Sequence, residues 1–272
     1  MSGPSASVGR ADFVPAFGPL LERAGLANYE SVMACRQGLR LDKPGLAGRE
    51  RIRLRLDWPD GGPAELYLKR YKTNGPAIRE WSALAEVRRA GVATMEPVGM
   101  GVGPAGGFVI VTAVPGEALS RCMGNLLERF SQDAGAMAEL ADGLGMLAGR
   151  LQAAGLAHRD FYTAHIFCDV CDPTGPAAKT PDRRFNLYLI DMARVFRPRW
   201  RKWRWRAKDL AGLKQSLDSA WVHRHWSGVI AAYERQLGRR LPLWVCWLID
   251  IRSWAGHRRA IRRLAASQAS RP

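Results

Sequence analysis

The sequence lacks an apolar run long enough to cross a bilayer. A spanning helix needs about 20 consecutive apolar residues. The best stretch, residues 241–249, is much shorter and is interrupted by Pro242. Residues 1–14 also lack the apolar segment that is typical of a signal peptide. We therefore expect a cytoplasmic protein.

Cysteines are few, odd in number and scattered, since the chain has five. This pattern favours reduced thiols over a disulfide framework. His165, Cys168 and Cys171 are spaced like three metal ligands. However, a single Cys-x-x-Cys pair without a second pair does not indicate a zinc site. We expect these cysteines to be ordinary thiols.

Acidic residues are scarce beside basic ones: 25 against 41, which gives a net charge of +16. Such a surplus attracts partners that carry phosphate. The densest basic run, residues 194–208, holds eight basic residues interleaved with Trp200, Trp203 and Trp205. This pattern suits an anionic membrane surface, single-stranded nucleic acid or a solvated basic face. The charge alone does not choose among the three.

The first part of the chain predicts a sheet. Residues 29–38 are interpreted as a strand, and residues 49–58 and 65–71 as a hairpin around a Pro-Asp-Gly-Gly turn. A helix over 78–90 and short strands over 98–100 and 108–112 are also predicted in this part of the chain. Residues 1–28 are interpreted as a loose or helical lead-in.

After Val114-Pro115-Gly116 the pattern becomes helical. Leucines at three- and four-residue spacing over 140–151 predict a long helix that Gly155 ends. Two short strands, 166–170 and 186–190, flank a surface insertion at 171–184. Helices follow from residue 208, and we expect five tryptophans to pack in their core: Trp221, Trp226, Trp244, Trp247 and Trp254.

Strands followed by helices indicate an α+β protein. We expect two lobes, a small antiparallel-sheet N-lobe and a larger helical C-lobe. The predicted boundaries are a lead-in over 1–28, an N-lobe over 29–114 and a C-lobe over 115–272.

Two signatures of protein kinases are absent. No G-x-G-x-x-G precedes Lys69, although Gly38, Gly45 and Gly48 lie where a phosphate-covering loop would be. Met192-Ala193 stands where those enzymes have Phe-Gly after the metal-binding aspartate. The loop is therefore predicted by position alone.

The polar residues of phosphoryl transfer are nevertheless present, in the chain order of protein kinases. Lys69, on a strand, is predicted to reach the phosphates of ATP, with Glu80 of the next helix as its partner. Helical periodicity favours Glu80 over Glu86, which falls on the solvent side.

His158-Arg159-Asp160 is interpreted as the catalytic loop. Asp160 would accept the proton of the attacking hydroxyl, and we count Arg159 and His165 among the catalytic residues. Asp191, which ends an apolar strand, is the predicted Mg²⁺ ligand. His165 stands at the second metal position, although Mg²⁺ prefers oxygen ligands. It is therefore a candidate for binding a metal, for hydrogen bonding to a phosphate or for holding Asp160.

The order of these residues predicts a two-lobed protein-kinase-like fold, with the nucleotide-binding sheet and helix in the N-lobe and the catalytic loop in the C-lobe. With these residues the chain resembles the lipopolysaccharide kinase family of the Kdo/WaaP type, over about residues 66–213. Tyr67–Tyr71, Arg79–Trp81, His158–His165 and Lys208–Leu213 carry the resemblance. In that family a histidine is usual at position 165, and Asp209 would be a scaffold carboxylate beneath the catalytic loop.

The resemblance implies ATP-dependent phosphorylation of a heptose or Kdo hydroxyl in the lipopolysaccharide inner core, with ATP and Mg²⁺. The implied partners are the lipopolysaccharide core or its lipid-linked precursor and the anionic inner face of the inner membrane. Nucleic acid is not the partner that we expect. Two alternatives stay open: a phosphotransferase acting on a protein or a soluble small molecule, and a non-catalytic kinase-like module at the membrane.

Overall fold

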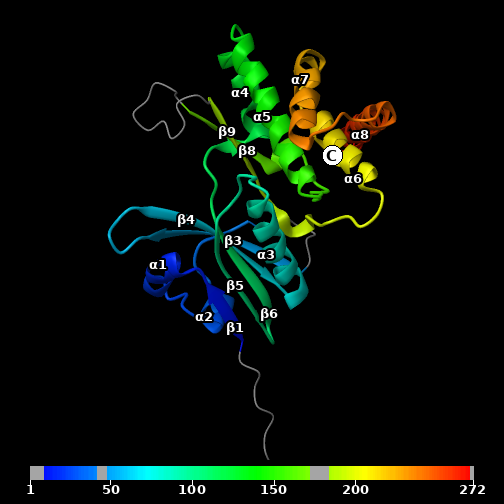
Figure 1. Ribbon diagram of the computed structural model, residues 1–272. Helices are drawn as coiled ribbons and strands as arrows, with labels where there is room; N and C mark the ends of the chain where they lie inside the picture. Colours follow the sequence, from blue (N-terminus) through cyan, green and yellow to red (C-terminus); the bar gives the residue numbers. More distant parts are fainter. Residues whose placement is uncertain (1–8, 42–47, 172–183, 270–272) are drawn as a thin grey trace, which may run out of the picture. The chain divides into compact units, whose positions relative to one another are not determined.

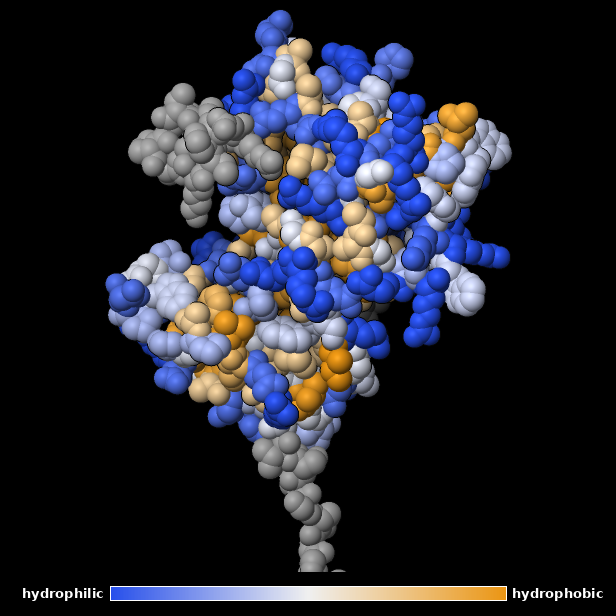
Figure 2. Space-filling view, viewed as in Figure 1, coloured by the Kyte–Doolittle hydropathy of each residue, from blue (hydrophilic) through white to orange (hydrophobic). Residues whose placement is uncertain are grey.

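The computed structural model describes residues 9–41, 48–171 and 184–269. The chain divides into two compact units. The first comprises Met1–Glu86 and Thr94–Val114, and the second comprises Val87–Ala93 and Pro115–Pro272. Hydrophilic side chains cover much of the face in view in Figure 2, with apolar side chains scattered among them.

The first unit is built on a six-stranded antiparallel sheet with the spatial order β1-β5-β6-β4-β3-β2. Figure 1 labels five of these strands, β1, β3, β4, β5 and β6. Its strands are β1 Arg10–Phe13, β2 Leu39–Arg40, β3 Arg49–Asp57, β4 Pro63–Tyr71, β5 Pro97–Gly103 and β6 Gly106–Thr112. Its helical segments are η1 Pro15–Phe17, α1 Gly18–Arg23, α2 Tyr29–Ala34 and α3 Asn74–Arg89. The predicted hairpin is confirmed, because β3 and β4 pair from Arg49↔Tyr71 to Asp57↔Pro63.

Alternation along β4 gives the two faces of the sheet different neighbours. Leu66 and Leu68 belong to an apolar core that also contains residues of α1 and α2. Tyr67, Lys69 and Tyr71 alternate with these residues and point to the other face, where Lys69 and Tyr71 meet α3. β4 lies inside the sheet, paired with both β3 and β6, so this lysine is carried by a strand that is fixed on both sides.

The strand predicted over residues 29–38 is wrong, because residues 29–34 form helix α2. The cause is a capping box. The side chain of Asn28 accepts from the amide of Ser31, and the hydroxyl of Ser31 accepts from the amide of Asn28. This local cap outweighs the β-propensity of Tyr29 and Val32.

The lead-in predicted over residues 1–28 is also corrected, since its described part belongs to the first unit. β1 pairs with β5, and Phe13 stacks on Phe108 with ring centroids 6.2 Å apart. α1 supplies Leu20 and Leu21 to the apolar core. The four-residue β1 is too short for its alternation to stand out in the sequence.

The second unit is mainly helical, with a small three-stranded sheet in the order β7-β8-β9. Its strands are β7 Glu117–Ala118, β8 Ile166–Val170 and β9 Phe185–Leu189. Its helical segments are α4 Leu119–Arg129, α5 Ala134–Ala153, η2 Thr163–His165, η3 Met192–Arg194, α6 Lys202–Ser216, α7 Ser219–Leu237 and α8 Leu243–Ala269. The predicted long helix and strand pair are confirmed as α5, β8 and β9.

α5 and α7 pack closely because glycines lie at their contact. A Cβ atom on Gly145 would lie 2.3 Å from the carbonyl oxygen of Val229, and one on Gly149 would lie 2.6 Å from the Cβ of Gln236. Further toward the C-terminal end of α5, the hydroxyl of Tyr233 donates to the side-chain oxygen of Gln152 at 2.7 Å. The helix that leads into the catalytic loop is thus held along its length.

Of the five C-terminal tryptophans predicted to pack in a core, one is buried, three are exposed, and the fifth, Trp226, is half-buried. Trp221 is buried, whereas Trp244, Trp247 and Trp254 are exposed. α8 instead buries the opposite side of its surface, through Val245, Ile249 and Ser253. Tryptophan content alone could not tell which face of α8 turns inward. Most of the insertion predicted at 171–184, and Gly45, lie outside the described residues.

Candidate active site

Lys69 of β4 and Glu80 of α3 form a buried ion pair in the first unit. The second carboxylate oxygen of Glu80 accepts a hydrogen bond from the hydroxyl of Tyr71, which lies on the same strand face as Lys69. A buried carboxylate with two partners holds its lysine in one place. The structure therefore brings together the two residues predicted to bind ATP, and adds Tyr71, which the sequence interpretation did not include.

The catalytic loop of the second unit begins where α5 ends. Gly155 has a left-handed backbone (φ 77°), which turns the chain out of the helix. Ala157 then forms two backbone hydrogen bonds with Phe196, of 2.9 and 3.0 Å. The loop that follows is thus held next to the segment after η3.

Asp209 of α6 holds the catalytic loop through hydrogen bonds to its backbone. Its carboxylate accepts from the backbone amides of His158 at 2.8 Å and of Arg159 at 2.9 Å. Burial raises the pKa of Asp209 to about 6, although these amides and Lys208 favour its charged form. This geometry fits the scaffold role that the family resemblance implies for Asp209.

His158 is fully buried and links the loop to the end of β9. Its Nε2 lies 3.0 Å from the carbonyl oxygen of Ile190. A carbonyl can only accept, so Nε2 carries the proton. Burial lowers the pKa of His158 to about 4, and the ring is therefore neutral near pH 7. His158 is a structural link between the loop and the strand that delivers Asp191.

Arg159 has a left-handed backbone (φ 70°), which is strained for a residue with a side chain. Its guanidinium lies over the rings of Phe196 and Trp205, 5.7 and 5.6 Å from their centroids. Its carbonyl accepts from the Nζ of Lys208 at 2.5 Å. The described contacts of Arg159 thus support the loop, and its predicted catalytic role stays a prediction.

Asp160 follows with its carboxylate held by Arg194 of η3. One guanidinium nitrogen of Arg194 lies 2.9 and 2.8 Å from the two carboxylate oxygens. The side chain of Asp160 is 19% exposed, so it is both oriented and reachable. Arg194 was not among the predicted site residues. The signal that could have found it is its position three residues after Asp191.

His165 and Asp191 complete the constellation. The Nδ1 of His165 lies 2.8 Å from the backbone carbonyl oxygen of Asp160 and must donate to it, so Nε2 is the ring nitrogen left to face a ligand. Asp191 follows β9 with a left-handed backbone (φ 62°). The backbone amide of Ile190 donates to the carbonyl of His165 at 2.9 Å. Asp160, His165 and Asp191 are therefore brought together by short backbone links.

The donor set fits a magnesium ion only in part. Within the described ranges, no three His, Cys, Asp or Glu side chains are grouped to hold a metal. Mg²⁺ in phosphotransferases is commonly held by one or two carboxylates together with substrate phosphates and waters. The carboxylate of Asp191 fits that pattern, whereas the imidazole of His165 is a poor ligand for this ion.

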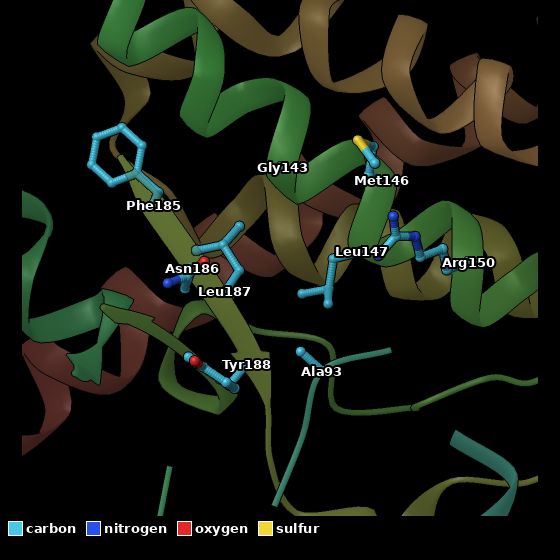
Figure 3. A pocket seen from close by; sticks show the side chains of 9 residues that line it. All are labelled: Ala93, Gly143, Met146, Leu147, Arg150, Phe185, Asn186, Leu187 and Tyr188. Atoms are coloured by element: carbon cyan, nitrogen blue, oxygen red, sulfur yellow. The ribbon is translucent and has the colours of Figure 1, made fainter. Parts of the chain in front are cut away.

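A cavity of about 130 Å³ lies elsewhere in the second unit, between α5 and β9 (Figure 3). Met146, Leu147 and Arg150 of α5 line it opposite the side chains of β9. None of the predicted site residues lines this cavity. It was not predicted from the sequence.

Comparison with known proteins agrees with this geometry. The profile of the lipopolysaccharide kinase (Kdo/WaaP) family matches residues 66–233. A solved structure of WaaP in complex with acyl carrier protein is similar, with 26% identity and a TM-score of 0.57, over 95% of this chain and 98% of that one. An aminoglycoside-3'-phosphotransferase of type VIII is 16% identical, with a TM-score of 0.46, over 80% of this chain and 94% of that one.

Curated protein sequences give no match. The family profile nevertheless covers more than half of the chain and includes Lys69, Glu80, Asp160 and Asp191. The predicted resemblance and fold class are confirmed. The chain belongs to the lipopolysaccharide kinase (Kdo/WaaP) family, and is an ATP-dependent phosphotransferase with a protein-kinase-like fold.

Proposed function

We propose that this kinase transfers the γ-phosphate of ATP to a sugar hydroxyl, on heptose or Kdo, in the lipopolysaccharide inner core. The observation that carries the proposal is the setting of Asp160. Its carboxylate is oriented by Arg194, and its backbone belongs to a loop anchored on Asp209. A base held in this way is suited to a hydroxyl acceptor.

In the proposed reaction the acceptor oxygen attacks the γ-phosphorus, and its proton passes to a carboxylate oxygen of Asp160. A bond forms between the sugar oxygen and phosphorus, the bond from phosphorus to the β,γ-bridging oxygen breaks, and ADP leaves. Arg194 keeps the carboxylate aimed during the transfer. Phosphoryl transfer depends mainly on such positioning and on charge stabilisation.

The other polar residues take supporting roles in this proposal. Lys69, held by Glu80, binds the α- and β-phosphates, and His165 presents Nε2 to a phosphate or a metal. Asp191 would hold Mg²⁺, which when bound would neutralise charge on the phosphate oxygens. Arg159 and Lys208 keep the loop in its strained shape.

The acceptor in this proposal is the lipopolysaccharide core or its lipid-linked precursor, met at the inner face of the inner membrane. The family and the excess of 41 basic over 25 acidic residues support an acceptor that carries anionic groups. No helix among the described residues is both long and apolar enough to span the bilayer. A protein that works there would bind at the surface.

The proposal is tested by incubating the purified chain with γ-labelled ATP, Mg²⁺ and lipopolysaccharide from a strain that lacks the gene. Label in the core sugars, with a mass increase of one phosphate on heptose or Kdo, is the expected result. Parallel reactions with protein and aminoglycoside acceptors test the alternative. Faster labelling of either acceptor than of lipopolysaccharide would overturn the proposal.

Replacing Arg194 tests whether it positions Asp160. We expect Arg194→Ala to lower kcat roughly ten- to a hundredfold, because a misaimed base costs about that much. Arg194→Lys should restore part of the rate, since it keeps the charge but not the planar guanidinium. The KM for ATP should stay unchanged. Arg235→Ala, which removes a surface arginine paired with Asp142, is the matched control and should leave kcat unaltered.

A further inference from the structure

α8 has an exposed aromatic stripe that the catalytic site does not use. Trp244, Trp247 and Trp254 are 54, 66 and 60% exposed, and Leu243 and Ile251 beside them are exposed as well. We call these five residues the tryptophan face. Their spacing of three and four residues places them on one side of the helix. The buried residues of α8 lie on the opposite side, so the tryptophan face is presented outward.

The charges of α8 are mostly positive. α8 contains five arginines and a single acidic residue, Asp250. Asp250 is paired with Lys214 of α6 at 2.6 Å. Arg258 and Arg262 continue the stripe at four-residue spacing after Trp254, and the guanidinium of Arg258 lies 4.7 Å from the centre of the Trp254 ring. A partner of this face must therefore supply negative charge.

The tryptophan face is also anchored to the rest of the second unit by packing of α8 on α6. Trp203 of α6 meets Trp244 edge-on, with ring centroids 6.3 Å apart, and Arg206 and Arg239 each lie 4.7 Å from the centre of the Trp203 ring. α8 is thereby tied to α6 at the start of the stripe. Three residues before Trp203, Trp200 is 82% exposed. The basic run 194–208 thus contributes one strongly exposed tryptophan, while α8 contributes three.

We propose that the tryptophan face is the surface by which this kinase lies on an anionic phospholipid bilayer. Indole rings favour the depth of the lipid headgroups, and arginines beside them pair with lipid phosphates. α8 would lie along the surface with Val245 and Ile249 toward the protein and Trp247 and Ile251 toward the lipid. A second copy of the chain fits less well, because the single carboxylate of α8, that of Asp250, already pairs with Lys214.

This inference rests on the proposed function only in that a lipid-linked acceptor gives a reason to bind membranes. Binding itself is measured without ATP and without lipopolysaccharide. The full-length chain is mixed with vesicles of phosphatidylcholine alone or with phosphatidylglycerol added, and the vesicles are floated at low and at physiological salt. We expect flotation with the anionic vesicles and little with the neutral ones.

Two variants locate the contact. Trp247→Ala combined with Trp254→Ala should weaken vesicle binding about tenfold or more, because buried apolar area carries much of interfacial binding. Arg258→Gln combined with Arg262→Gln should weaken it roughly tenfold at low salt and less at high salt. The control pair, Arg121→Gln with Arg224→Gln, makes the same change of charge at exposed positions of α4 and α7 and should bind almost as wild type. Thermal unfolding checks that each variant is folded.

The outcomes separate the two proposals. If the folded tryptophan variant floats as well as wild type, or if wild type does not float, the inference is overturned. It is also overturned if the face instead mediates a dimer or binds an acidic protein. Flotation without labelling of lipopolysaccharide would contradict the proposed function and support the membrane-binding inference. Labelling without flotation would support the proposed function and contradict the inference.

Discussion

Replacing Asp160 with Asn should lower kcat about 10²–10⁴-fold, the usual contribution of a positioned general base. The amide has nearly the shape of the carboxylate but cannot take up the acceptor proton. ATP should bind with unchanged affinity, because the lysine predicted to hold its phosphates, Lys69, lies in the other unit. Initial rates with γ-labelled ATP and nucleotide titration by calorimetry measure the two quantities.

The matched control is Asp142→Asn. Asp142 is a carboxylate of the same unit that also pairs with an arginine, Arg235, at the surface of α5 and α7. Its replacement should leave kcat within about twofold of wild type, since exposed ion pairs contribute little. If Asp160→Asn retained more than about a tenth of the wild-type rate, Asp160 would not be the base.

Much of the site was predictable because it depends on local periodicity. The alternation of β4 places Lys69 on one strand face, and the turn of α3 places Glu80 on the flank of its buried side. Both are set by neighbours in the sequence, and the structure pairs the two residues. The hairpin, α5 and the pair β8–β9 were predictable for the same reason.

The rest depends on contacts between distant segments. Arg194 reaches Asp160 across 34 residues of sequence, and Asp209 holds the loop from 50 residues away. Propensity carries no information on such distances, and the role of Asp209 was anticipated only from the family resemblance. The exposed side of α8 depends likewise on where α6 lies. The misassigned strand at Tyr29 is different, because its cause, the capping pair Asn28 and Ser31, is local and lies in the sequence itself.

Replacing Asp209 with Ala should lower the free energy of unfolding by about 2–5 kcal/mol at pH 7. The change leaves the buried amide of His158 and the half-buried amide of Arg159 without an acceptor, and a buried group of this kind costs about 1–3 kcal/mol. Chemical denaturation followed by circular dichroism measures the loss. Phosphotransfer should fall with it even where the protein stays folded, because the loop that carries Asp160 is no longer anchored.

The control for this prediction is Asp218→Ala. Asp218 also accepts from a backbone amide, that of Trp221 at the start of α7, at 2.8 Å. Loss of a helix cap costs typically about 1 kcal/mol, less than we expect for Asp209. Equal losses for the two variants would mean that Asp209 is an ordinary cap and not the anchor of the loop.

The pH dependence gives a second measure of the same residue. Because burial raises the pKa of Asp209 to about 6, the folded protein takes up this proton at a higher pH than the unfolded chain does. The resulting stabilisation is fully present below about pH 4, the ordinary range of an aspartate, and is lost as the pH rises through 6.

The variant Asp209→Asn isolates this contribution. Its residue 209 cannot titrate, whereas His158 titrates in both proteins, so the contribution of His158 cancels from the difference in their stabilities. The stability gap between wild type and Asp209→Asn should therefore narrow, by at most about 3 kcal/mol, between pH 4 and pH 7. A gap that widened over this range would show that the amides and Lys208 outweigh burial and that the pKa of Asp209 is lowered.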